Sequence, residues 1–132
     1  DEIYEDESRF VNFSSEYITL VSIETDEASK IHVYRYANSW LKSFNFEGVI
    51  YTFVIYDKHA FLSAVEKDND LSSTETIYCF KIDEQVIEKI TELSGDIDLF
   101  VGSDDNVYVS STDFDGVRLY SLDGNYKEII LK

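Results

Sequence analysis

The stretch "DLFVGSDDNVYVSSTDFDGVRLYSLDGNYKEIILK", residues 98–132, alternates short apolar runs with clusters of Asp, Ser, Asn and Gly. Runs of roughly 4–8 residues that are rich in Val, Ile, Tyr and Phe, and that are separated by turn residues, are typical of antiparallel strands. We therefore predict four strands in this part of the chain, at 96–102, 106–113, 117–122 and 126–132.

The same order of runs and turns occurs twice more upstream. It predicts strands at 49–56, 59–66, 76–82 and 85–93, and before them at 9–13, 17–24, 31–36 and 39–46. The third strands share a core in which apolar residues alternate before a Tyr or Phe: "KIHVYRY" (30–36), "TIYCFKI" (76–82) and "VRLYSL" (117–122). A unit of four strands that recurs every ~40 residues indicates the blade of a propeller. We predict one all-β domain that contains an acidic tail and three repeats, at 1–8, 9–48, 49–95 and 96–132.

The order and spacing of these strands resemble the blades of WD-repeat and YVTN-type β-propellers over residues 9–132. The resemblance implies three tandem four-stranded antiparallel sheets in an open or partner-completed propeller. The "GH…WD" signature of the WD repeat is absent, and Trp40 begins a fourth strand instead of ending a third. No functional residue is therefore transferred from these families.

Two other fold classes compete with this interpretation. Twelve short strands also suit a β-sandwich or barrel without true repeats. An α+β fold is the second alternative, because Val86, Ile87, Ile90 and Leu93 follow a helical spacing between Asp83 as an N-cap and Gly95 as a stop. The segment 58–67 is similarly ambiguous. We predict strands in both, because the corresponding segments of the third repeat, 126–132 and 106–112, are rich in β-branched residues.

The charge restricts the partners of the chain. Eleven Lys and Arg residues stand against 27 Asp and Glu residues, which gives a net charge of −16. Nucleic acid and anionic lipid both need a basic surface, so neither is an expected partner. The longest apolar runs are too short for a membrane span. We expect a protein partner with a basic surface.

The acids concentrate in the loops between second and third strands, which emerge on one side of a propeller. These loops carry the predicted protein-binding rim: Glu24, Asp26, Glu27, Glu66, Asp68, Asp70, Asp113 and Asp115. Carboxylates gathered on one rim focus a negative potential that attracts basic protein. The alternative is that these residues only form turns and a solvated surface, because Asp and Asn favour turns for local reasons.

Closed propellers usually contain four to eight blades, and three blades leave an open arc with exposed ends. We expect the arc to be completed by a second copy of the chain, giving six blades, or by further blades. The predicted aromatic anchors for a partner are Tyr34, Tyr36, Trp40 and Tyr120, and ordinary core packing is the alternative role for these side chains.

No catalytic motif is recognisable in the sequence. Cys79 and the two histidines, His32 and His59, have no spacing that predicts a nucleophile with its base or a zinc site. The stretch "STDFDG" (111–116) lacks the first and last ligands of a calcium loop. We therefore expect no metal, no cofactor and no enzymatic activity.

The predicted function is a non-catalytic protein-protein interaction module. The alternatives are a small acidic inhibitor or immunity-type protein and a carbohydrate-binding propeller lectin.

Overall fold

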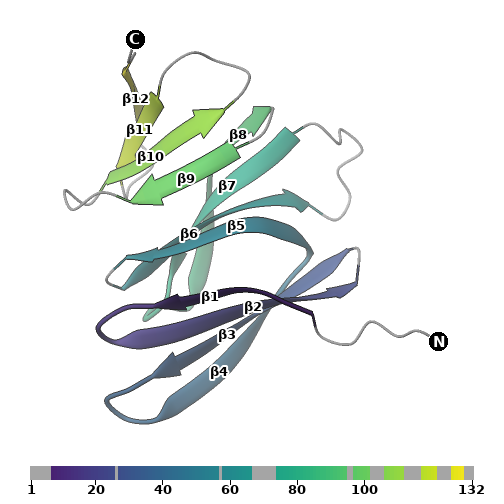
Figure 1. Ribbon diagram of the computed structural model, residues 1–132, viewed down its shortest axis with the longest axis vertical. Helices are drawn as coiled ribbons and strands as arrows, with labels where there is room; N and C mark the ends of the chain where they lie inside the picture. Colours follow the sequence, from purple (N-terminus) through teal and green to yellow (C-terminus); the bar gives the residue numbers. More distant parts are fainter. Residues whose placement is uncertain are drawn as a thin grey trace.

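Three four-stranded antiparallel sheets follow one another along the chain in the computed structural model (Figure 1). Sheet 1 contains β1 (Glu7–Phe13), β2 (Tyr17–Thr25), β3 (Ala28–Arg35) and β4 (Trp40–Phe46). Sheet 2 contains β5 (Gly48–Tyr56), β6 (His59–Glu66), β7 (Thr74–Lys81) and β8 (Val86–Ser94). Sheet 3 contains β9 (Ile97–Val101), β10 (Asn106–Ser111), β11 (Val117–Ser121) and β12 (Tyr126–Ile129).

The structure describes residues 7–25, 27–56, 58–66, 74–94, 97–101, 106–111, 117–121 and 126–129. Side chains are described from Phe10 onward, except those of Tyr56, Ser94, Val101 and Asn106 and those of β11 and β12. In each sheet, neighbouring strands in space are also neighbours in the chain. The described residues contain no helix, so the predicted all-β class is confirmed.

The segment at 83–95 forms a turn and a strand. Strand β8 pairs with β7 from Val86 opposite Lys81 to Ser94 opposite Thr74. The helical alternative for this segment is therefore wrong, because pairing with β7 overrides the weak helical spacing. The arrangement of the strands in three sheets also differs from a two-sheet sandwich.

The sheets are stacked face to face, with sheet 2 in the middle (Figure 1). In β2 and β3 of sheet 1, buried and partly exposed residues alternate, as expected for strands with one covered face. Strands β6 and β7 instead contain five consecutive buried residues each, at 60–64 and 76–80. Sheet 2 is therefore covered on both faces, which explains its nearly continuous apolar runs.

Two hydrophobic cores hold the stack together. The first lies between sheets 1 and 2, where the ring of Phe80 meets that of Phe44 edge to face with centroids 4.9 Å apart. The second lies between sheets 2 and 3 and contains Phe61, Cys79 and Val109. Aromatic pairs in this geometry add to the stabilisation from burial.

The outer hairpins of sheets 1 and 2 share an unusual backbone feature. Ser39 ends the turn between β3 and β4 with φ 54°, and Gln85 ends the turn between β7 and β8 with φ 59°. Non-glycine residues rarely adopt positive φ. The same conformation at the same position of both hairpins shows that the two sheets are built alike.

Candidate functional site

One edge of the stack carries a group of five carboxylates. The C-terminal ends of β2, β6 and β10 all lie on this side, at the right of Figure 1. We call it the acidic edge and define it by Glu24, Glu27, Glu47, Glu66 and Glu92. Lys30 lies beside Glu24 at 3.5 Å, and Lys89 donates a hydrogen bond to Glu92 at 2.9 Å.

The predicted rim residues fall partly on this edge. Glu27 is exposed, while Glu24 and Glu66 are half-buried. Glu66 accepts a hydrogen bond from the Tyr78 hydroxyl. Burial first, and this hydrogen bond next, raises the pKa of the Tyr78 phenol. The other predicted rim residues lie outside the described residues: Asp26, Asp68, Asp70, Asp113 and Asp115.

The opposite edge holds a cluster of paired charges that joins sheets 1 and 2. Arg35 donates hydrogen bonds to Asp83 and, at 2.8 Å, to the Tyr17 hydroxyl, which itself donates to Asp83. Lys58 lies 3.8 Å from the same carboxylate. The Arg35 guanidinium also lies 5.7 Å from the centre of the Trp40 ring. We call Tyr17, Arg35, Lys58 and Asp83 the Asp83 cluster.

The Asp83 cluster neutralises much of the charge on its edge. A small open pocket adjoins it, lined by Lys58, His59, Lys81, Asp83 and Glu84. Its basic residues are engaged within the molecule, since Lys58 lies beside Asp83 and Lys81 lies 3.1 Å from Glu88. Burial, followed by the hydrogen bond to Asp83, raises the pKa of the Tyr17 phenol, while Arg35 opposes that rise.

Sequence reasoning missed this cluster. The sequence indicates only a potential helix cap at Asp83, and it places Tyr17 and Arg35 inside the predicted strands 17–24 and 31–36. Tyr17 and Asp83 are 66 positions apart in the chain. They meet because of the way sheet 1 stacks on sheet 2, and no local pattern carries that information.

The predicted aromatic anchors occupy different surroundings. Tyr34 lies on the outer face of sheet 1, where its ring meets that of the exposed Tyr36 edge to face at 6.1 Å. Trp40 packs against the core between sheets 1 and 2. Tyr120 pairs with Val107 in the backbone ladder, and its side chain lies outside the described residues. The structure therefore brings Tyr34 and Tyr36 together and keeps Trp40 apart from them.

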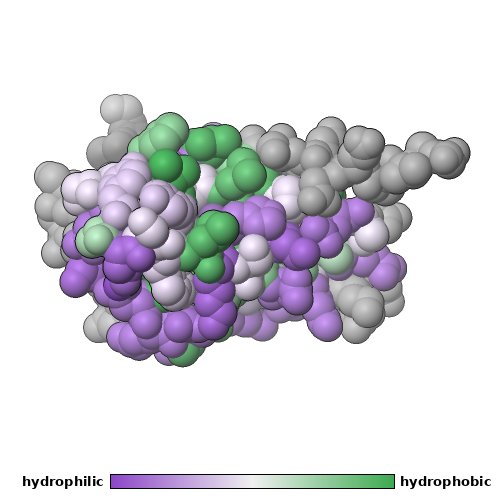
Figure 2. Space-filling model, turned by 90° about the horizontal axis from the view of Figure 1, so that it is seen from below, coloured by the Kyte–Doolittle hydropathy of each residue, from purple (hydrophilic) through white to green (hydrophobic). Residues whose placement is uncertain are grey.

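The outer face of sheet 1 carries apolar side chains, and no other sheet of the described residues covers it. Backbone register places two rows of side chains on it: Phe13, Ile18, Tyr34 and Leu41, and next to them Val11, Leu20, His32 and Ser43. Of these, Val11, Phe13 and Leu41 are 56%, 66% and 70% exposed. We call these two rows the open face. Figure 2, which views the molecule from the sheet 1 end, shows hydrophobic side chains gathered on part of this surface beside hydrophilic ones.

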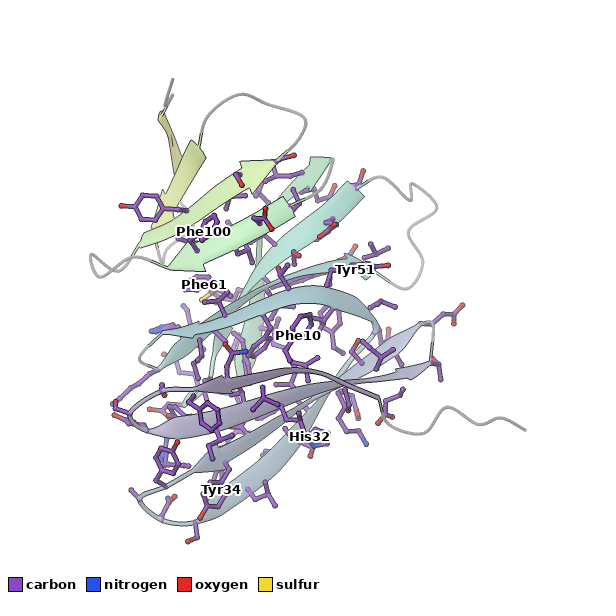
Figure 3. All side chains as sticks on the ribbon, viewed as in Figure 1. Phe10, His32, Tyr34, Tyr51, Phe61 and Phe100 are labelled. Atoms are coloured by element: carbon purple, nitrogen blue, oxygen red, sulfur yellow. The ribbon has the colours of Figure 1, made fainter. Side chains whose placement is uncertain are left out.

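The residues considered for catalysis lie in separate places. Cys79 is buried between sheets 2 and 3, and His59 lies at the edge pocket. His32 lies on the open face, where its ring nitrogens lie 2.8 Å from the hydroxyl of Ser43 and 3.3 Å from that of Ser22 (Figure 3). Across the described ranges, no three His, Cys, Asp or Glu side chains are grouped as a metal site requires.

The alkylation rate of Cys79 tests whether its thiol is buried or reactive. Burial, the largest cause, raises the pKa of the Cys79 thiol from 9.0 to about 11. At pH 8 the folded chain should therefore react with iodoacetamide about 100-fold more slowly than the unfolded chain, because alkylation requires the thiolate. The stability that this thiol contributes is full below pH 9 and is lost as the pH rises to about 11.

An exposed thiol provides the control for this measurement. Ser15 is exposed in the turn between β1 and β2, so Ser15→Cys in a Cys79→Ser background should react at the rate of an unfolded chain. Equal alkylation rates for Cys79 and for this control would contradict the burial of Cys79.

The comparisons with known proteins add no relative. No protein-family model matches the chain, and neither a curated protein nor a solved structure shows significant similarity to it. In the part of the chain that the structure describes, no helix has the length and apolar character of a membrane span. The surfaces of this chain are therefore the guide to its function.

Proposed function

We propose that the chain is a non-catalytic protein-binding module built from three propeller-type blades, and that its acidic edge receives a basic protein surface. The observation that carries this proposal is a difference in charge between the two edges: at the acidic edge, Lys30 and Lys89 pair with two of its five defining carboxylates. Lys58, Lys81 and Arg35 lie on the opposite edge, where they pair with Asp83 and Glu88. The acidic edge keeps exposed carboxylates, among them Glu27 and Glu47.

This difference makes the negative potential directional. A net charge of −16 spread evenly would attract a basic partner from every side. Charge focused on one edge also orients the partner as it approaches, and it raises the association rate more than the final affinity. Affinity itself would come from a few anchoring side chains near the contact.

Two variants with the same net charge test the proposal, with poly-L-lysine as the basic probe. Glu27→Gln, Glu47→Gln and Glu92→Gln together remove charge from the acidic edge. Glu16→Gln, Glu84→Gln and Glu88→Gln together remove the same charge from the opposite edge. The sets are matched because Glu92 and Glu88 are each paired with a lysine, at 2.9 and 3.1 Å.

We expect the first variant to slow association by about threefold to tenfold in stopped-flow measurements at low salt, and the second to slow it clearly less. Raising the ionic strength should weaken binding of the unmodified chain, because exposed charges are screened. Equal slowing by the two variants would show that only net charge matters and would contradict a directional edge.

A further inference from the structure

We infer that two copies of this chain associate head to tail, with the open face of sheet 1 in one copy covered by the outer face of sheet 3 in the other. The inference concerns surfaces away from the acidic edge. It rests on the blade-type stacking in the proposed function and on no property of the basic partner.

Sheet 2 shows what normally covers a face like the open face. The strand registers make Tyr34 the counterpart of Phe80, since Tyr34 pairs with Ile18 and Leu41, and Phe80 pairs with Ala60 and Ile87. In the adjacent row, Leu20 is the counterpart of Leu62, since Leu20 pairs with Val11 and Leu62 pairs with Phe53. Phe80, Ala60 and Leu62 are all fully buried against sheet 1. The open face therefore has the layout of a blade face that another sheet covers.

The third sheet repeats this relation. Its Ile97, Leu99, Val107 and Val109 side chains are buried against sheet 2. Within one chain, sheet 1 thus covers one face of sheet 2, and sheet 2 covers the equivalent face of sheet 3. Only the equivalent face of sheet 1, among the three, has no preceding sheet in the described part of the chain.

The covering surface is available at the other end of the stack. The outer face of sheet 3 presents Phe100, which is 55% exposed, in register with Tyr108. In sheet 2 the corresponding pair is Val54 and Phe61, whose face contacts the next sheet. Figure 3 labels His32 and Tyr34 in sheet 1, at one end of the stack, and Phe100 in sheet 3, at the other end. One chain therefore carries both halves of the contact.

The number of sheets fixes the size of the assembly. Closed propellers contain four to eight blades, and the only multiple of three in that range is six. Two copies of the described part of the chain, with three sheets each, give six sheets, and a head-to-tail contact that closes after two copies covers the open face of each copy. Both acidic edges then lie on the same side of the ring.

Charge makes the behaviour of this dimer distinctive. Two chains of −16 repel each other, so added salt should strengthen their association. Binding of a basic partner at the acidic edge has the opposite dependence on salt. The two processes can therefore be told apart, and failure of one leaves the other intact.

Sedimentation of the full chain over a range of concentrations, at low and at moderate salt, provides the test. We expect a dimer that becomes more stable as salt is added. Leu41→Lys changes the open face and Phe100→Lys changes the outer face of sheet 3. Each should weaken the dimer at least about tenfold, because it places a charge in an apolar contact. Lys lowers the net repulsion, so weakening cannot come from net charge. Val86→Lys, on the outer strand of sheet 2 at a residue 39% exposed, is the control and should change nothing.

Mixing the two variants distinguishes head-to-tail from symmetric contact. The Leu41→Lys chain keeps an intact sheet 3 face, and the Phe100→Lys chain keeps an intact open face, so an equimolar mixture should form a heterodimer through one unmodified contact. If the dimer instead formed between two open faces, the Phe100→Lys chain would stay dimeric, and mixing it with the Leu41→Lys chain would not increase dimer formation. That result would overturn the inference.

A monomer at every concentration and salt would overturn the inference too. In that case Nile red, an uncharged apolar probe, would show whether the open face serves another protein: binding that Leu41→Lys abolishes would assign the face to a different occupant. Circular dichroism of each variant confirms that the fold is retained, as expected for exposed positions.

Discussion

Replacing Phe80 by Ala is expected to lower the free energy of unfolding by about 3–5 kcal/mol. Phe80 is fully buried in the core between sheets 1 and 2, and its ring meets that of Phe44 at an interplanar angle of 71°. Removal of the ring takes away both its burial and the aromatic contact, and it leaves a cavity between two stacked sheets that cannot easily collapse. Chemical denaturation monitored by circular dichroism measures the effect.

A smaller change at Phe80 tests whether the loss of stability depends on the volume that is removed from the core. Phe80→Leu keeps an apolar side chain in the same place and should cost less than half as much, because most of the cavity stays filled. A loss below about 1 kcal/mol for Phe80→Ala would show that sheets 1 and 2 do not share a tight core. Since whole domains are stable by only about 5–15 kcal/mol, the expected loss is a large part of the total.

The strands could be predicted because their signals are local. Alternation of apolar and polar residues, together with turn residues at short intervals, placed strands in all twelve segments where the structure has them. The segment at 83–95 shows the limit of this reasoning, since four apolar residues there fit a helix as well as a strand. Its pairing with β7 decides the outcome, and pairing is a tertiary property.

The surfaces were harder to predict for a physical reason. A period of two assigns residues to two faces of a strand, but it does not say which face another sheet covers. Val11 and Phe13 are apolar and exposed, while Ala60 and Leu62 are apolar and fully buried. The difference follows from the place of each sheet in the stack. The Asp83 cluster has the same origin, because Tyr17 and Arg35 come from sheet 1 while Lys58 and Asp83 come from two turns of sheet 2.

We propose different roles for the acidic edge and for the open face. The edge consists of carboxylates at strand ends and in turns, and the exposed ones among them act at a distance. The open face belongs to the sheet, whose side chains act only on contact. Association through the face would place the acidic edges of two chains on one side of a ring, so that a basic partner meets a larger negative surface than a single chain offers.

The short connection between sheets 1 and 2 depends on one glycine, and this gives the second prediction. Gly48 is the first residue of β5, and only Glu47 separates it from β4. Its φ is 150°, a conformation that residues with side chains rarely adopt. A Cβ atom there would lie 2.5 Å from the carbonyl oxygen of Val65 and 2.9 Å from Cε2 of Phe46. The neighbouring backbone is fixed as well, because Ser29 donates a hydrogen bond of 2.8 Å to the Gly48 carbonyl oxygen and accepts one from the Ile50 amide.

Gly48→Ala is therefore expected to lower the free energy of unfolding by about 2–6 kcal/mol, the sum of backbone strain and overpacking of about 1–3 kcal/mol each. Glu47→Ala is the matched control at the adjacent exposed position and should change stability by less than about 0.5 kcal/mol. Thermal and urea denaturation of both variants provide the measurement. If Gly48→Ala proved as stable as Glu47→Ala, Gly48 would not lie as close to β6 as the structure places it. The short connection between sheets 1 and 2 would then not be tightly packed.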